Sequence, residues 1–82
     1  MSRPIYEIAR EVTADIHVGN WSLNAANYAL PYLAAMKDLD KVTDDYMQDS
    51  GKSVVLYFLS NASTWRGETA RRIKAELKDL AK

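Results

Sequence analysis

Two apolar stripes run along the stretch from Ser22 to Tyr46, and this pattern constrains the fold more than any other feature. A helix that is apolar on two sides must be covered on two sides. In a chain of 82 residues, we expect one cover to come from the same chain and the other from a second copy. The first stripe is Leu23, Ala26, Leu30 and Leu33, and the second is Tyr28, Tyr32, Ala35, Leu39, Val42 and Tyr46.

Pro31 lies inside this helical pattern. Proline removes one helical hydrogen bond and clashes with the preceding turn, so it kinks or breaks a helix. Because the apolar spacing continues beyond Pro31, the sequence predicts a kink there and not an end. Of the second stripe, we expect Tyr28, Leu39 or Val42 to contribute to an interface between copies.

Three further segments have helical features. Pro4 and the apolar spacing after it predict a short helix over residues 4–16, which Gly19 ends. The apolar run Val54–Leu59 fits a buried strand or a helix, and we favour the helix because nothing else reads as a pairing strand. A last helix is expected from about Trp65 to Leu80.

These segments predict an all-α fold with a single domain over residues 1–82. The short first helix would pack on two long antiparallel helices, one of them kinked at Pro31. A break near Ser60–Thr64 in the other leaves open whether residues 54–62 and 65–80 form one continuous helix. The chain has no cysteine, so disulfides cannot stabilise so small a core, and we expect an oligomeric bundle.

Composition argues against several functions. The formal net charge is zero, whereas proteins that bind duplex DNA or membrane surfaces usually have a basic excess. No apolar run approaches the roughly 20 residues of a membrane span, and the first residues lack the apolar core of a signal peptide. We therefore expect a cytoplasmic protein without membrane contact.

The residues that catalysis usually needs are sparse. With one histidine, His17, and no cysteine, the sequence offers neither a metal cluster nor a thiol nucleophile. Asp44 and Asp45 are adjacent, so on a helix their side chains would point about 100° apart and would not form an acid–base pair. We expect a protein that is not an enzyme and that has no metal and no cofactor.

Gly51-Lys52-Ser53 has the ending of a phosphate-binding P-loop. The motif needs a glycine five residues before Gly51, and that position is Tyr46. The expected fold also lacks the parallel sheet of these nucleotide-binding domains. The tripeptide is therefore interpreted as a serine-rich helix start.

The stretch from Ser63 to Thr69 is the best candidate for a ligand site. Ser63 and Thr64 are helix-capping residue types, and the first turn of a helix has unpaired amides and partial positive charge. Arg66, Gly67 and Thr69 would then offer charge, close approach and a hydroxyl to a phosphate. The alternative is a structural cap in which Trp65 is a buried anchor and the arginines are solvated.

Tyr6 is a candidate for contact with a nucleobase. It lies beside Arg10 on the first helix, off the apolar stripe. An exposed tyrosine next to a cation either stacks on a base or simply keeps its hydroxyl in water. Trp65 is the second candidate aromatic face.

Several segments together resemble a group of very small phage-encoded helical proteins. They are Pro31–Met36, Val54–Ala62, Trp65-Arg66-Gly67 and Ala70–Leu77, about half of the chain. Among such proteins, the chain is most similar to the anti-CBASS cyclic-nucleotide sponges. These have a short first helix on two longer antiparallel helices, assemble as hexamers, and sequester cyclic di- and trinucleotides without cleaving them.

The resemblance implies a phage anti-defence protein that acts in the infected bacterial host. Its ligand would be a cyclic oligonucleotide, with Tyr6, Trp65, Arg66, Gly67 and Thr69 as ligand-binding residues and a hexamer as the assembly. This chain has no lysine between Arg10 and Lys37, where the family has a basic contact early in its second helix. The alternative function is a small helical module that binds and inhibits a host protein through an apolar face.

Overall fold

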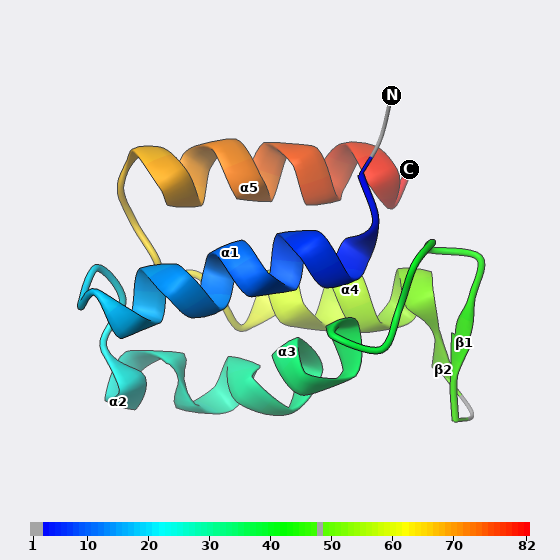
Figure 1. Ribbon diagram of the computed structural model, residues 1–82, viewed down its shortest axis with the longest axis horizontal. Coiled ribbons are helices and arrows are strands. Elements are labelled where there is room, and N and C mark those ends of the chain that lie inside the picture. The colour runs from blue at the N-terminus through cyan, green and yellow to red at the C-terminus, as the bar shows by residue number, and fades with distance from the viewer. Residues whose placement is uncertain (1–2, 48) are drawn as a thin grey trace.

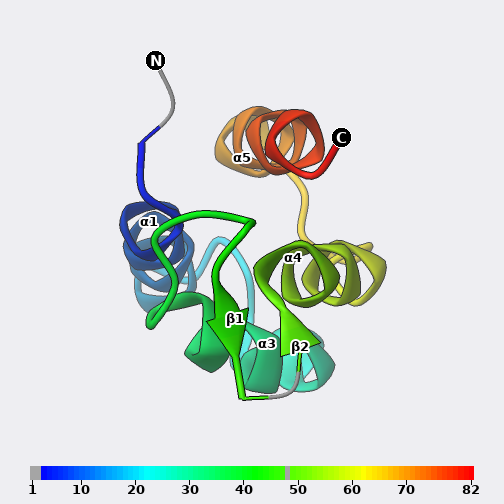
Figure 2. The same ribbon diagram turned by 90° about the vertical axis from the view of Figure 1, so that its right-hand side faces the viewer.

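Helices in three layers build the fold in the computed structural model, which describes residues 3–47 and 49–82 (Figure 1). Helix α5 forms the upper layer, α1 and α4 the middle layer, and α2 and α3 the lower layer. Seen along the helices, α5 lies above α1 and α4, and α3 packs beneath both (Figure 2). The elements are α1 Ile5–His17, α2 Leu23–Ala26, a 3-10 turn Asn27–Ala29, α3 Leu30–Met36, β1 Asp45–Tyr46, β2 Asp49–Ser50, α4 Gly51–Ser60 and α5 Glu68–Leu80.

Helix α1 confirms the helix predicted for residues 4–16, shifted by one residue. Its apolar face is fully buried, through Ile5, Ile8, Ala9 and Val12. Gly19 ends the helix with φ +89°, a left-handed conformation that favours glycine. The amides of Gly19 and Asn20 donate to the carbonyls of Ile16 and Asp15, which is the pairing of a Schellman end.

The long helix expected from Ser22 to Tyr46 is wrong. The Ser22 hydroxyl caps α2 as an N-cap residue should, but α2 ends at Ala26 and passes into a 3-10 turn. Pro31 lies in the first turn of α3, where its missing N–H costs nothing. Proline therefore marks a restart of the helix and not a kink within it, and α3 ends at Met36.

The segment after Met36 leaves the helix, and its backbone forms hydrogen bonds with the start of α1. The carbonyls of Leu39 and Asp40 accept hydrogen bonds from the amides of Tyr6 and Ile5, the first amides of α1. The Asp44 carboxylate in turn accepts from the amides of Asp40 and Lys41. The two bonds from Ile5 and Tyr6 satisfy amides that a helix start leaves unpaired, and they join residues more than thirty positions apart.

Strands β1 and β2 overturn the all-α expectation. They form a short antiparallel pair with Asp45 opposite Ser50 and Tyr46 opposite Asp49. Met47 turns the chain between them with φ 57°. The last residue of the predicted stripe, Tyr46, therefore lies on a strand and not on a helix, and the fold is mainly helical with a small hairpin at one end (Figure 1).

The apolar run Val54–Leu59 is helical as predicted, within α4. The chain breaks after Ser60, so α4 and α5 are separate helices joined by residues 61–67. Two long antiparallel helices are therefore not the architecture of this chain. One core of apolar side chains is shared by α1, α3, α4 and α5, and its largest members are Trp21, Trp65 and Phe58.

Candidate functional site

The sequence marked the start of α5 for function, and in the structure this helix start is open. Gly67 precedes the helix with φ +112°, and a Cβ added there would meet no atom within 4 Å. Within the described part of the chain, no side chain caps this helix. The amides of the first turn have no partner inside the helix, so they present donors and partial positive charge at this end.

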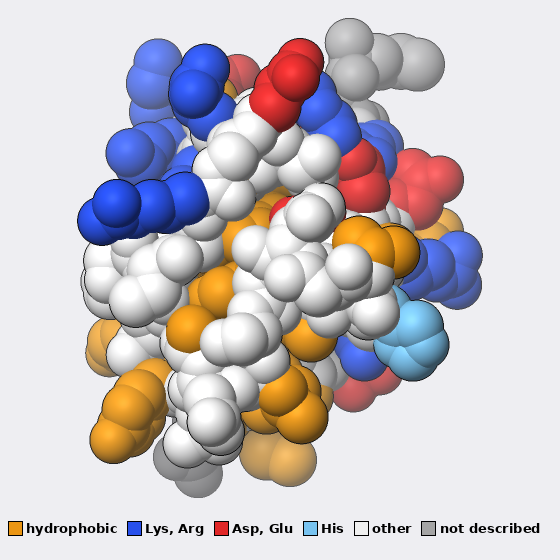
Figure 3. Space-filling model, turned by 90° about the vertical axis from the view of Figure 1, so that its left-hand side faces the viewer, with side chains coloured by type: hydrophobic (Ala, Val, Ile, Leu, Met, Phe, Trp, Pro, Cys, Tyr) orange, Lys and Arg blue, Asp and Glu red, His pale blue; other side chains and the backbone are white. Residues whose placement is uncertain are grey.

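Three cations surround this helix start. Arg66, Arg71 and Lys74 line one hollow of about 340 Å³ together with Trp65, Gly67 and Ala70. The blue side chains at the upper left of Figure 3 gather on this side of the molecule. We call Arg66, Gly67, Arg71 and Lys74 the basic corner. It carries no carboxylate of its own, so it suits an anion.

Lys74 is held in the basic corner by the backbone. Its ammonium donates to the carbonyl of Trp65 over 2.6 Å. Burial lowers the pKa of Lys74 below its ordinary 10.5, and the charges of Lys78 and Arg66 lower it further. Burial and neighbouring positive charge therefore both disfavour the charged form of Lys74, and a bound anion would favour it.

Thr69 does not line the hollow of Arg71 and Lys74. It lines a second hollow, of about 290 Å³, together with the acidic residues Asp15 and Glu68. Arg66 and Gly67 border both hollows. The structure therefore brings Thr69 together with Arg66 and Gly67 but not with Arg71 and Lys74, and the acidic residues that share its hollow disfavour a phosphate.

Trp65 is a buried anchor and offers no exposed face for stacking. Its side chain is 0% exposed and lies parallel to Trp21, with ring centroids 5.2 Å apart. Its indole N–H donates to the Asp15 carboxylate over 2.7 Å. The other oxygen of Asp15 accepts from the Asn20 amide, so this buried carboxylate is paired on both sides. The alternative interpretation, a structural role for Trp65, describes this geometry.

Tyr6 is partly exposed but lies away from the basic corner. The Arg10 guanidinium carbon is 5.3 Å from the centre of its ring and covers one face. Tyr6 lies in the first turn of α1, whereas Asp15, which borders the second hollow, lies near the other end of that helix. Nine residues of helix span roughly 14 Å, so one copy of the chain does not bring Tyr6 and Arg66 to one small ligand.

Arg71 and Lys74 are the site residues that the sequence interpretation missed. The signal was present in the spacing, because Gly67, Arg71, Lys74 and Lys78 recur at intervals of four, three and four residues. That spacing places them along one side of a helix. Neighbouring Arg72 is on another side, where it pairs with Glu11 of α1.

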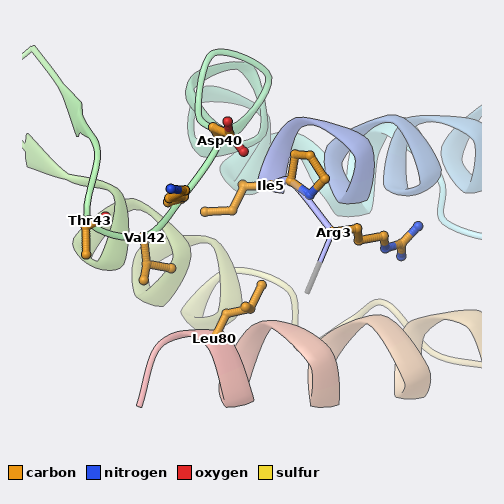
Figure 4. A pocket seen from close by; sticks show the side chains of 8 residues that line it. Arg3, Ile5, Asp40, Val42, Thr43 and Leu80 are labelled. Atoms are coloured by element: carbon orange, nitrogen blue, oxygen red, sulfur yellow. The ribbon is translucent and has the colours of Figure 1, made fainter. Parts of the chain in front are cut away.

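A third hollow lies at the opposite end of the molecule from the basic corner. It has a volume of about 380 Å³ between the start of α1, the segment 40–43 and the end of α5 (Figure 4). Ile5, Val42 and Leu80 give it an apolar floor. The Arg3 side chain points away from it in Figure 4 and is paired with Glu11 and Glu76, so the hollow has no free guanidinium aimed into it.

No group of three or more His, Asp or Glu side chains in residues 3–47 and 49–82 is placed to hold a metal ion. In the same part of the chain, no helix has the length and apolar character that crossing a membrane requires. Comparison with known proteins found no family model, no curated protein and no solved structure that matches the chain. The function must therefore be argued from the geometry of the site.

Proposed function

We propose that this protein binds a small ligand carrying phosphate groups at the basic corner and holds it without cleaving it. The observation that supports this proposal is the convergence of Arg66, Arg71 and Lys74 on a helix start that no side chain caps within the described residues. Guanidinium groups form charge-assisted hydrogen bonds to phosphate oxygens, and helix-start amides add donors. Zero net charge is compatible with such a site, because only local charge acts on a small ligand.

The ligand class we propose is a cyclic di- or trinucleotide, as the resemblance to the phage sponges implies. Such a ligand has phosphates close together on a small ring, and the three cations of the basic corner line one hollow. In this proposal the protein acts in the cytoplasm of an infected bacterium and blunts host immunity by sequestration. Assembly into a homo-oligomer, a hexamer by resemblance, is part of the same proposal.

The test is calorimetric titration with a panel of cyclic di- and trinucleotides. We expect at least one of them to bind, and Arg66→Ala to weaken that binding by roughly 1.5–3 kcal/mol, the usual range for a hydrogen bond to a charged group. Arg71→Gln should act in the same direction. Lys52→Gln is the matched control, since Lys52 is an exposed cation at the start of α4.

Two results would count against the proposal. Full-strength binding by Arg66→Ala would remove the phosphate role from the basic corner, and failure of every nucleotide in the panel would remove the ligand class. Chromatography of the released ligand after long incubation checks the absence of catalysis. Linear products would contradict sequestration.

The second candidate function is a module that covers a host protein. It is favoured by exposed apolar side chains on the lower layer and on α4, among them Tyr28 and Tyr57. A protein-binding module presents such side chains as one patch, whereas a sponge presents aromatic side chains in polar pockets beside arginines. Binding of a host protein without any nucleotide binding would favour this second candidate.

A further inference from the structure

Charge is absent from two long stretches of this chain. Residues 20–36 and 53–65 contain no Lys, Arg, Asp or Glu, although these residues make up 27% of the sequence. The stretches are more than a third of the chain. All Lys, Arg, Asp and Glu residues of the chain lie outside these two stretches.

The fold places these two stretches side by side. Residues 20–36 form α2, the 3-10 turn and α3, and residues 53–65 include most of α4. Helices α3 and α4 pack directly against each other (Figure 2). Tyr32 and Tyr57 stack across this contact, with ring centroids 5.5 Å apart. The result is a continuous uncharged face.

Large apolar and aromatic side chains are exposed on this face. Tyr28 is 76% exposed, Tyr57 52% and Leu56 46%. Exposed Asn27 and Ser60 add uncharged polar groups around them. In Figure 3 the lower left of the view shows orange and white atoms, while blue atoms gather above at the upper left. Tyrosine enrichment with depletion of charge is the composition of an interface core.

We propose that this uncharged face, built from α3 and α4, binds the same face of a second copy of the chain. When a face meets itself about a two-fold axis, a charge near the axis lies close to its own copy, so both signs are unfavourable there. A foreign partner can complement a charge of either sign outside the interface core, whereas no charge of either sign interrupts these two stretches. The absence of both signs therefore points to a second copy.

A standard interface covers roughly 800 Å² of each partner, which is a minor part of the 5321 Å² surface of this molecule. The inference also corrects the interface residues expected from the sequence. Leu39 is 1% exposed and Val42 lines the hollow at the other end, so of the three only Tyr28 lies on this face.

This inference deepens the assembly part of the proposed function and is independent of the ligand. The test is the mass of the ligand-free protein by light scattering and sedimentation across a concentration series. We expect a self-associated wild type, and we expect Tyr57→Lys and Tyr28→Lys to raise the dissociation constant about thirtyfold or more, as for an interface hot spot. Val18→Lys is the matched control, since Val18 is 72% exposed outside the face and should leave association unchanged.

Three results would overturn the inference. They are a monomeric wild type, self-association that neither tyrosine variant weakens, and equal weakening by Val18→Lys. Tyr28 has the larger exposed fraction, so its variant decides the matter if Tyr57→Lys unfolds. A wild type that stays monomeric but captures another protein through this face would assign the face to a foreign partner. Because no nucleotide is added, failure here is distinguishable from failure of ligand binding.

Discussion

Helices α4 and α5 both begin beside a glycine and a basic residue, yet one start is closed and the other is open. At α4, the amides of Gly51 and Lys52 donate to the carbonyls of Asp44 and Val42, and the Ser53 amide donates to the Ser50 hydroxyl. A Cβ on Gly51 would lie 2.8 Å from the Lys41 carbonyl oxygen. The amides of Gly51-Lys52-Ser53 are therefore already paired, and this P-loop-like tripeptide is a structural helix start.

At α5 the glycine is required by backbone conformation and not by crowding. Gly67 has φ +112° and open space around its Cα, and cations line the adjacent hollow. The comparison shows that a glycine, a cation and a hydroxyl in sequence do not define an anion site. An anion also needs first-turn amides that are not already bonded, and their bonding depends on segments distant in the chain.

The largest expected effect concerns the buried support of the open start. Trp65→Ala should lower the free energy of unfolding by about 3–5 kcal/mol, because it empties a core position. It also leaves one oxygen of Asp15 without its donor. Urea unfolding followed by circular dichroism measures the change.

Trp65→Phe is the control for this substitution. It keeps an aromatic ring but loses the N–H, so we expect a smaller loss of stability than for alanine. Unchanged stability of Trp65→Ala would show that α5 does not depend on this anchor and would reopen the stacking role for Trp65.

Amide hydrogen exchange separates the two starts in the unmodified protein. We expect the amides of Gly51, Lys52 and Ser53 to exchange at least about a hundredfold more slowly than those of Glu68, Thr69 and Ala70, since within the described residues only the former donate to tertiary or cap acceptors. Exchange resolved by NMR gives both rates in one sample. Equal protection at the two starts would break the comparison, and added ligand should slow exchange at α5 alone.

The smallest expected effect is a pH dependence of the folding stability, which arises from the ion pair between Arg72 of α5 and Glu11 of α1. The hydrogen bond from Arg72 lowers the pKa of Glu11 below its ordinary 4.5, and Arg3 lowers it further, against the opposing effect of burial. A lowered pKa in the folded state means that this stabilisation is present above pH 4.5. It is lost as the pH falls through the folded-state pKa.

Glu11→Gln tests this linkage. The variant should flatten the fall in melting temperature below pH 4.5 and should change it little near neutral pH beyond a small constant loss. The effect is modest because these side chains are accessible to solvent and screened by salt. An identical pH profile for the variant and the wild type would exclude a contribution from Glu11.

Local signals in the sequence were sufficient for α1, for its end at Gly19 and for the helical state of Val54–Leu59. They failed for residues 37–50, because the carbonyls of Leu39 and Asp40 serve the start of α1 and this contact has no local signature. A regular apolar spacing through Leu39 and Tyr46 was present, but tertiary hydrogen bonds overrode it.

The candidate site was predictable only in part for the same reason. Arg66 and Gly67 lie at a helix start as expected, but they precede the helix, because α5 begins at Glu68 and not at about Trp65. The buried indole N–H of Trp65 donates to Asp15, fifty residues earlier in the chain. The residue spacing around Trp65 does not predict that partner. Arg71 and Lys74 were accessible to sequence reasoning through their helical spacing.

The stacked pair Trp21 and Trp65 gives this molecule a built-in optical reporter. The chain has two tryptophans, and both indoles lie together, buried and nearly parallel at 14°. Their emission and their coupled circular-dichroism bands therefore arise from one place, directly beneath the start of α5. A spectral change on adding a ligand would come from that place, whereas events at the hairpin end would leave the tryptophan signal silent.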